Sequence, residues 1–146
     1  MDGISVCECS VNDIIRIATQ IPEFDNPYQE AEYNRRLSGT PFLALKASIE
    51  GIDVGFKLGY AIDSDTFYTW FGGVLPQYRK LGMAQKLAVS QEEWAVAHGY
   101  KRIKLKTRNY LKPMLIFALK NGFYIHEVEL RPAPRDNRII LLKELE

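Results

Sequence analysis

Apolar and polar residues in the first half of the chain follow two different periods. Alternation with a period of two, typical of half-buried strands, occurs over residues 4–9, 42–48, 54–62 and 66–74. Apolar residues at helical spacing over 11–21 predict a helix, with Ser10 suited to the N-cap and Pro22 ending it. A loop and a second, weaker helix are expected over 23–37. The short connections between the last three strands predict an antiparallel meander.

Beyond Pro76 the apolar period changes to that of a helix. A helix is predicted from about Leu81 to His98, and Gly99 stands where a left-handed residue commonly ends a helix. The later elements are a strand over 100–107, a helix between Pro113 and Asn121, and two strands over 123–130 and 138–145. Because a helix connects the strand at 66–74 to the strand at 100–107, these two strands are expected to lie parallel.

The order of elements indicates an α/β (α+β) fold with a mixed sheet, and a single domain is expected over 1–146. The hydrophobic share of 47% and the charged share of 25% are ordinary for a globular protein. The sequence has no apolar run of membrane-spanning length, and residues 1–10 lack the basic and apolar regions of a secretory signal. We therefore expect a cytoplasmic protein with no membrane partner.

The two cysteines, Cys7 and Cys9, lie two residues apart in a predicted strand. Their side chains would share one face of that strand, where they cannot easily bridge to each other. A Cys-x-Cys metal site needs further ligands, and no histidine lies nearby in the sequence. We expect two free thiols and no metal.

Charge is unevenly distributed along the chain, although the net charge is only +1. Residues 1–78 hold 5 Lys/Arg against 11 Asp/Glu, whereas residues 79–120 hold 10 against 2. Residues 121–146 hold 4 against 5 and are nearly balanced. The basic central block is either a solvated face or a surface for an anionic ligand.

The stretch GVLPQYRKLGMAQKLA, residues 73–88, joins a predicted strand to the long helix. The positive charges of Arg79 and Lys80 and the bare backbone of Gly82 precede the first helical turn. Unpaired amides and the dipole at a helix N-terminus favour an anion, and glycine lets the backbone approach it closely. The stretch lacks the spaced glycines of a dinucleotide fingerprint and the Gly-Lys-Ser/Thr of a P-loop. It predicts a cradle for a pyrophosphate.

The run RKLGMA, residues 79–84, resembles motif A of the GNAT superfamily, which reads Arg/Gln-x-x-Gly-x-Gly/Ala at the start of a helix. A second stretch, TRNYLKPMLIFALKNGF over 107–123, resembles motif B with its asparagine and its closing Gly-Phe. The close resemblance covers about 66–123, and the strand order elsewhere agrees. It implies an N-acetyltransferase that uses acetyl-CoA as acetyl donor. It also implies a sheet whose central parallel strands splay around the cofactor, with helices on both faces.

The resemblance also implies which residues meet acetyl-CoA. The backbone of Gly72 and Val74 would bond the pantetheine arm and the acetyl carbonyl, and the Val74 amide would stabilise the tetrahedral intermediate. The other implied contacts are the amides of Arg79, Lys80, Leu81, Gly82, Met83 and Ala84 around the pyrophosphate, Asn109 of motif B, Met114 and Phe117 along the arm, and Lys120 or Lys112 at the ribose phosphate. The basic block would then have a use, because CoA carries three phosphate groups.

The sequence leaves the catalytic proton-transfer groups open. Many family members carry a tyrosine, the usual general acid, four residues before the motif B glycine, but here that position is Ala118. We expect Ala118 to face the cofactor arm and to leave room for water or for a bulky acceptor. An alkyl amine is mostly protonated at neutral pH and needs a base. Glu23, Asp63 and Asp65 are candidates through water, and each also fits as a plain surface carboxylate.

The expected acceptor is a primary amine of a small molecule or a peptide. In such folds the two N-terminal helices usually form one wall of the acceptor groove, and here their connection reads EFDNPYQE, residues 23–30. Its acidic residues and the aromatic Tyr28 suit a cationic amine, although a solvated loop has the same composition. Tyr68 and Trp70 lie on one face of the strand that enters the site, where they contact either the acceptor or the core.

Two other functions fit part of the sequence. Ala118 suggests a CoA-binding or acyl-CoA-binding protein of the same fold without catalysis. A nucleic-acid binder would use the lysines of YKRIKLKTRNYLK, residues 100–112, but a net charge of +1 is low for that class, so no nucleic-acid partner is expected. The length of the acyl group on the donor and the formation of a homodimer are left open.

Overall fold

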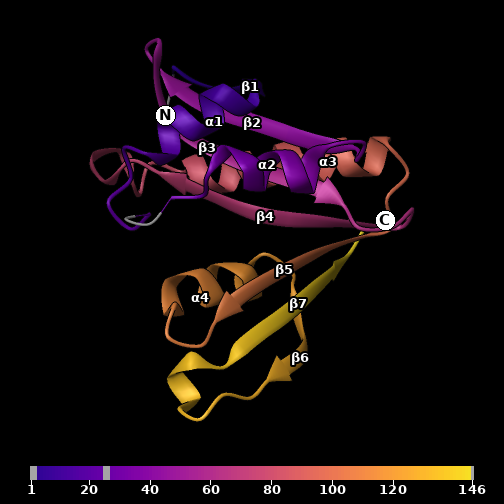
Figure 1. Cartoon of the computed structure of the whole chain (residues 1–146). Helices are drawn as coiled ribbons and strands as arrows, with labels where there is room; N and C mark the ends of the chain where they lie inside the picture. The colour runs from indigo at the N-terminus through magenta and orange to yellow at the C-terminus, as the bar shows by residue number, and fades with distance from the viewer. Residues whose placement is uncertain (1–2, 25–26, 146) are drawn as a thin grey trace.

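The computed structural model of the protein describes residues 3–24 and 27–145 (Figure 1). Within these residues, seven strands form one sheet in the order β1-β2-β3-β4-β5-β7-β6. The strands are β1 Ile4–Glu8, β2 Phe42–Ile49, β3 Ile52–Ala61, β4 Thr66–Val74, β5 Arg102–Arg108, β6 Tyr124–Glu129 and β7 Arg138–Glu144. The helices are α1 Val11–Ala18, α2 Glu30–Leu37, α3 Met83–Ala97 and α4 Lys112–Lys120, and short 3-10 turns cover Pro76–Tyr78 and Pro134–Asp136.

The strand pairings confirm the predicted α/β (α+β) fold with its antiparallel meander and its parallel pair. Each of β1 to β4 pairs antiparallel with its neighbour in sequence. β4 and β5 are parallel, because α3 carries the chain back across the sheet between them. β7 lies between β5 and β6 and is antiparallel to both. That order was not predicted, since periodicity identifies a strand without identifying its partner.

β4 and β5 are paired only where they begin. Pairing covers Thr66–Tyr68 of β4 and Arg102–Lys104 of β5 and then stops. Beyond this point the strands separate. In Figure 1 a V-shaped opening lies between β1–β4 with α1 to α3 on one side and β5–β7 with α4 on the other. A bulge in β4 leaves Trp70 without a partner on β3 close to the point where the strands part.

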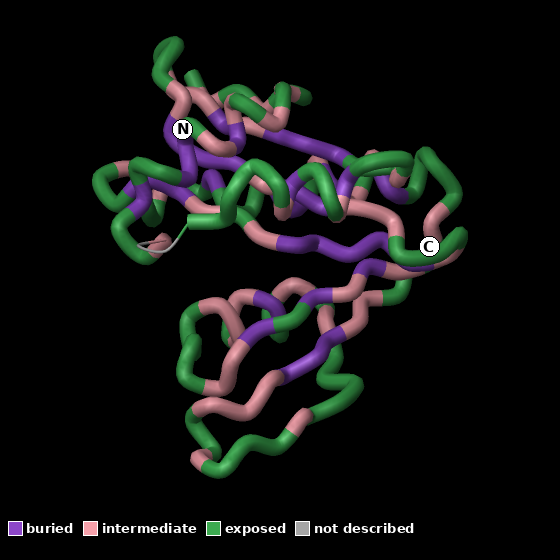
Figure 2. Tube along the Cα trace, viewed as in Figure 1, coloured by how far each residue is buried: buried purple, intermediate pink, exposed green. Residues whose placement is uncertain are grey.

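Helices cover both faces of the sheet, as the resemblance implied. A Cβ added at Gly73 would meet Ile21 just beyond α1, whereas one added at Gly59 would meet Gln91 of α3. The segment after α1 and helix α3 therefore lie on opposite faces of the sheet. Burial is concentrated in the central strands, while β6 is exposed along most of its length (Figure 2).

The helix ends follow the signals in the sequence, with small differences. Ser10 caps α1 through a capping box with Asp13. α1 ends at Ala18, earlier than the apolar spacing predicted, because the buried Ile21 belongs to the turn that follows. Gly99 has a φ of 85° directly after the C-cap of α3, as predicted.

Both cysteines are free thiols. Cys9 lies just after β1, and burial raises its pKa to about 12. Across residues 3–24 and 27–145, no cluster of three or more His, Cys, Asp or Glu side chains is placed to hold a metal ion. No helix in this part of the chain is long and apolar enough to cross a membrane.

Candidate active site

The loop between β4 and α3 presents a row of backbone amides. Lys80 and Gly82 both have left-handed backbone angles, with φ of 65° and 88°. Left-handed residues within a turn bring successive N–H groups together in an anion-binding nest. The first bond of the helix runs from the Lys86 amide to the Gly82 carbonyl oxygen (3.1 Å). In the described part of the chain, the amides of residues 80–85 have no backbone acceptor. We call this segment the amide nest.

The surroundings of Gly82 leave space for a ligand. A Cβ added at Gly82 would meet no atom within 4 Å. The positive φ explains the glycine, and the open space is available to an anion that approaches the nest. Lys80 and Lys86 are exposed and add positive charge close to the start of α3.

Arg79 does not direct its charge toward the nest. Its guanidinium donates to both carboxylate oxygens of Glu23 at 2.7 and 2.9 Å, and its Nε donates to the Val74 carbonyl oxygen at 2.9 Å. The Arg79 amide is also engaged, because it donates to the Pro76 carbonyl oxygen at 3.3 Å. The expectation that Arg79 helps to hold the pyrophosphate is therefore not supported. Arg79 instead ties the segment after α1 to the end of β4.

The free edge of β4 faces the opening between β4 and β5. The Leu75 amide donates to the Val54 carbonyl oxygen on β3 at 2.8 Å. Because backbone groups alternate in direction along a strand, those of Val74 and Gly72 point away from β3 toward the opening. A Cβ at Gly72 would lie only 2.8 Å from the Phe56 carbonyl oxygen, so glycine is required there. The amides of Gly72 and Val74 are available for the contacts that the sequence predicted, whereas the Val74 carbonyl oxygen already accepts from Arg79.

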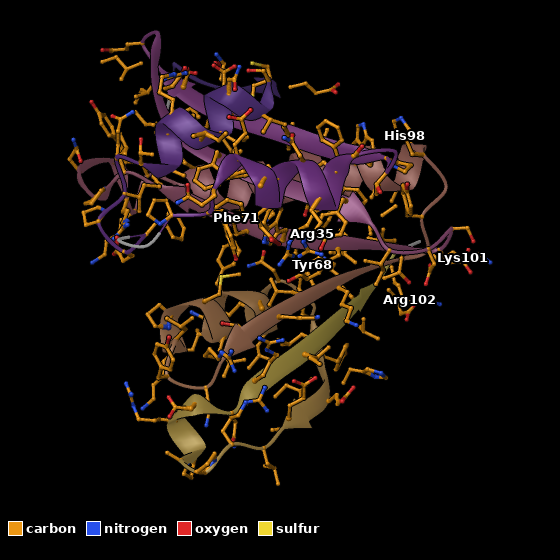
Figure 3. All side chains as sticks on the ribbon, viewed as in Figure 1. Arg35, Tyr68, Phe71, His98, Lys101 and Arg102 are labelled. Atoms are coloured by element: carbon orange, nitrogen blue, oxygen red, sulfur yellow. The ribbon has the colours of Figure 1, made fainter. Side chains whose placement is uncertain are left out.

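A cavity of about 440 Å³ fills the opening between β4 and β5. Residues of α2, β3, β4, β5, α4 and β7 line it, together with Tyr28 just before α2. The three residues predicted to contact the acceptor, Tyr28, Tyr68 and Trp70, all lie in its walls. Figure 3 shows Tyr68 and Phe71 on the side of β4 that faces the opening. We call this space the main cavity.

Aromatic rings form one wall of the main cavity. The ring centroids of Tyr28 and Trp70 lie 4.9 Å apart, and those of Trp70 and Phe71 lie 5.1 Å apart. Tyr68 and Trp70 are only 8% and 6% exposed, so they belong both to the core and to the cavity wall. The bulge at Trp70 explains how two consecutive residues of a strand, Trp70 and Phe71, both reach Tyr28.

A splayed parallel pair with an amide nest at the following helix is also what the sequence motifs implied. The model of the Acetyltransferase (GNAT) family matches residues 10–123, which is most of the chain. The chain belongs to the GNAT acetyltransferase family. Members of this family transfer an acetyl group from acetyl-CoA. We therefore ask how the nest and the free edge of β4 suit the chemical groups of acetyl-CoA.

Solved structures of GNAT acetyltransferases share the fold at low sequence identity. The ribosomal-protein-S18-alanine N-acetyltransferase from Escherichia coli is 15% identical and superposes with a TM-score of 0.83, covering 98% of this chain and 94% of that one. A GNAT family acetyltransferase from Elizabethkingia anophelis with acetyl-CoA bound is 18% identical, with a TM-score of 0.76 and coverage of 99% and 100%. The IAA acetyltransferase from Bacillus cereus is 17% identical, with a TM-score of 0.79 and coverage of 97% and 99%. No curated protein matches the chain in sequence.

Lys57 of β3 connects the main cavity of this GNAT protein to a second, smaller cavity. It lines both, together with Thr69 of β4 and Met114 of α4. Burial lowers the pKa of the Lys57 amino group to about 8, and the charge of Glu92 opposes this shift in part. Glu92 itself pairs with Lys143 at 2.8 Å. Sequence reasoning missed Lys57, because a single lysine in an alternating strand reads as solvent-facing.

Ala118, at the position of the usual GNAT tyrosine, lies between the core and the smaller cavity. It is 1% exposed and packs with Leu105, Ile139 and Leu141. The smaller cavity beside it measures about 20 Å³, which is room for about one water molecule. Ala118 therefore borders a space for water, but the expected room for a bulky acceptor is absent at this position.

Of the remaining cofactor contacts implied by the GNAT motifs, some lie at the cavities and others do not. Met114 lines both cavities and Phe117 lines the smaller one. Asn109, in contrast, donates its side-chain amide to the Pro134 carbonyl oxygen at 3.0 Å. Lys120 is exposed in the last turn of α4 and lines neither cavity. The structure thus brings Met114 to the main cavity and Phe117 to the smaller one, and it directs Asn109 to a neighbouring loop.

The carboxylates nominated as general bases are engaged elsewhere. Hydrogen bonds from Arg79 lower the pKa of Glu23 to about 2, so Glu23 stays ionised and paired at neutral pH. Asp63 accepts backbone amides in the turn before β4, and Asp65 lies in the same turn. That turn is at the opposite end of β4 from Val74. None of the three lines the main cavity, which argues against each of them as the base.

Proposed function

We propose that the protein is an N-acetyltransferase that moves the acetyl group of acetyl-CoA to a primary amine of a small molecule or of a peptide by direct attack. The main support is that three features of the structure occur together at one site. The amide nest of residues 80–85 suits the pyrophosphate, and the free edge of β4 at Gly72 and Val74 suits the pantetheine arm and the thioester. The main cavity lies along the same edge, extends to Arg36 of α2 and is large enough for a small acceptor.

In this reaction the amine nitrogen attacks the carbonyl carbon of the thioester and forms a tetrahedral intermediate. The C–S bond then breaks, and CoA leaves as a thiolate that takes up a proton. The Val74 amide points into the opening and is the donor we assign to the oxyanion. Since the nominated carboxylates are engaged elsewhere, the acceptor loses its proton to water, and turnover rises with pH as more amine becomes neutral.

Turnover with a panel of primary amines tests the proposal. Purified protein is incubated with acetyl-CoA and each amine, the free thiol of CoA is measured, and the product is examined by mass spectrometry. We expect thiol release that depends on an amine, together with an N-acetylated product. Binding of CoA with no thiol release from any amine would instead favour the non-catalytic CoA-binding protein.

A further inference from the structure

The charged side chains that line the main cavity are all positive within residues 3–24 and 27–145. They are Arg36 of α2, Lys57 of β3, Lys106 and Arg108 of β5, and Arg138 of β7. No aspartate or glutamate of the described chain lines this cavity. We propose that the acceptor amine also carries an anionic group, a carboxylate or a phosphate, which these cations bind. The inference rests on the proposed function, because it names the chemical class of that acceptor.

The cations reach the cavity from both sides of the opening. On β5, Leu105 packs into the small core beneath α4, so the alternating residues Lys106 and Arg108 point to the opposite face of the sheet. That face carries α2, where the Arg36 guanidinium lies 4.3 Å from the centroid of the Trp70 ring. An anionic group between α2 and β5 would therefore meet positive charge on two walls, with the aromatic rings available to the rest of the acceptor.

The arrangement of these cations lowers the stability of the fold. Arg108 and Arg138 are direct partners across β5 and β7, and like charges in such a pair repel each other. The Lys106 side chain is exposed to the cavity, but partial burial of its amino group lowers its pKa, and the charges of Lys104 and Arg138 lower it further. Local features that oppose stability are expected mainly at functional sites. A bound anion would relieve this repulsion.

Carboxylates of the protein neutralise only part of this cluster. The Arg36 guanidinium pairs with Glu32 at 2.7 Å, whereas the cluster's cations on β5 and β7 form no ion pair in the described chain. Glu129 is the partner of Arg138 on β6, but its carboxylate pairs with Arg131 at 3.3 Å. Arg108 donates to a backbone carbonyl oxygen, which carries no net charge. In the described chain, Arg138 and Lys106 form no ion pair, so two positive charges remain available to a ligand.

Acetyl-CoA is the other anionic molecule in the reaction, but its phosphates have a separate site. The amide nest of residues 80–85 stands at the start of α3, which packs on the opposite face of the sheet from Phe24. Helix α2 lies on the Phe24 face, because Tyr33 of α2 and Phe24 both pack against Phe71. Arg36 and Lys106 face the α2 side, where the acceptor enters. Arg36, Lys106, Arg108 and Arg138 are therefore assigned to the acceptor rather than to CoA, whereas Lys57 lies toward α3 and is left out of this assignment.

The acidic composition of residues 23–30 predicted a cationic acceptor, and the cavity does not support that expectation. Of the described residues in this segment, only Tyr28 lines the main cavity. Glu23 is bound to Arg79, and Asp25 and Asn26 lie outside the described residues. The charge that an acceptor meets is set by β5, β7 and α2 instead.

Matched pairs of amines test the proposal. An α-amino acid is compared with its carboxamide, and phosphoethanolamine with ethanolamine, by measuring kcat/KM at fixed acetyl-CoA. One charge-assisted contact corresponds to about tenfold or more in affinity, so we expect the anionic member of at least one pair to be preferred by that factor. The same compounds are titrated into the CoA-bound protein in thermal-shift measurements, which detect binding without turnover.

Arg138→Gln and Lys106→Gln are the test variants, and Lys101→Gln is the control. The Lys101 side chain is 68% exposed and lies where β4 and β5 meet, at the closed end of the opening (Figure 3). We expect each test variant to lower kcat/KM for the anionic amine by about tenfold while the neutral partner and the dissociation constant of CoA change less than about twofold. The control is expected to match wild type, and circular dichroism verifies folding.

The outcomes separate this inference from the proposed function. If neutral amines are acetylated as well as anionic ones, the inference fails while the N-acetyltransferase stands. If Arg138→Gln and Lys106→Gln weaken CoA as strongly as the acceptor, the cations serve the cofactor, and the inference also fails. If no amine is acetylated, the proposed function fails, and stabilisation of the CoA complex by the anionic compounds alone still decides whether the cavity binds anions.

Discussion

Glu23 and Arg79 form a two-pronged ion pair between segments that lie 56 residues apart in sequence. The same guanidinium donates to the Val74 carbonyl oxygen, so one side chain connects the segment after α1 to the end of β4. This ion pair changes the role expected of both residues. Arg79 is bound to the end of β4 to which we assign the thioester, and Glu23 holds Arg79 in place.

Glu23→Gln is expected to keep the rise of turnover with pH. Because Arg79 holds the pKa of Glu23 at about 2, its carboxylate is ionised throughout the range in which an amine loses its proton. The Glu23 side chain is 59% exposed, so loss of the pair should cost no more than about 1 kcal/mol of unfolding free energy. The measurement is kcat/KM against pH for wild type and variant. If the turnover of Glu23→Gln no longer rises with pH and its kcat is lower by about a hundredfold or more, Glu23 is the base after all.

The pH dependence of this ion pair follows from the direction of the shift. A carboxyl whose pKa falls on folding stabilises the fold above its ordinary value of 4.5 and loses that contribution as the pH falls toward 2. The difference in unfolding free energy between wild type and Glu23→Gln should therefore be constant near neutral pH and shrink in acid.

Gly82→Glu is expected to abolish CoA binding and to leave the fold intact. CoA at a hundredfold excess over its dissociation constant stabilises a protein by about 2.7 kcal/mol, or several degrees in melting temperature. The new carboxylate would lie beside the amide nest and repel the phosphates. Gly51→Glu is the matched control, since Gly51 also has a positive φ, of 82°, with no atom within 4 Å of an added Cβ. Equal loss of the CoA shift in both variants would argue against the nest.

Lys57→Met is expected to raise stability at neutral pH. The pKa of Lys57 is lowered from 10.5 to about 8, so below pH 8 the amino group is charged in both folded and unfolded states and its burial penalty is fully present. As the pH rises from 8 toward 10.5, the folded state loses the proton first and the penalty disappears. At about 1.4 kcal/mol per pKa unit, the variant should be more stable by up to about 3 kcal/mol at neutral pH.

The measurement for Lys57→Met is chemical denaturation at several pH values, with Lys101→Met as an exposed control. The advantage of the variant over wild type should narrow as the pH approaches 10.5. A difference that stays constant with pH would mean that side-chain packing, rather than the buried charge, sets the effect.

Periodicity and end signals were sufficient for most of the fold because they act locally. Ser10, Gly99 and the change of period after Pro76 each determine backbone geometry within a few residues, and the structure has a helix start, a helix end and a helix at these places. The position of β7 between β5 and β6 depends on long-range pairing. No spacing along the chain encodes that choice.

The candidate site likewise has a part that local sequence signals predict and a part that depends on long-range contacts. The amide nest was predictable because Lys80 and Gly82 lie within a few residues of the helix start. The cations of the main cavity were not predictable, because Arg36, Lys106 and Arg138 come from three elements that meet only in the folded chain. The basic block was visible in the sequence, but its use was assigned entirely to the phosphates of CoA.

Ala118→Tyr tests whether this chain has room for the tyrosine that many GNAT proteins carry. Ala118 is 1% exposed, and the cavity beside it measures only about 20 Å³. A tyrosine ring would displace Leu105, Leu141 or Met114, and overpacking of this kind costs about 1–3 kcal/mol. The melting temperature should therefore fall by several degrees. Because Met114 also lines the main cavity, we expect the KM for acetyl-CoA to rise.

Ala97→Tyr, at an exposed position of α3, is the control for adding a tyrosine to a helix, and it should change neither property. The two properties of Ala118→Tyr are read separately, the melting temperature from thermal denaturation and the KM from thiol release. An unchanged melting temperature with higher turnover would mean that the ring enters the opening and donates to the CoA thiolate. In that case the space beside Ala118 is wider than the structure indicates, and water in that space supplies the proton in the natural protein.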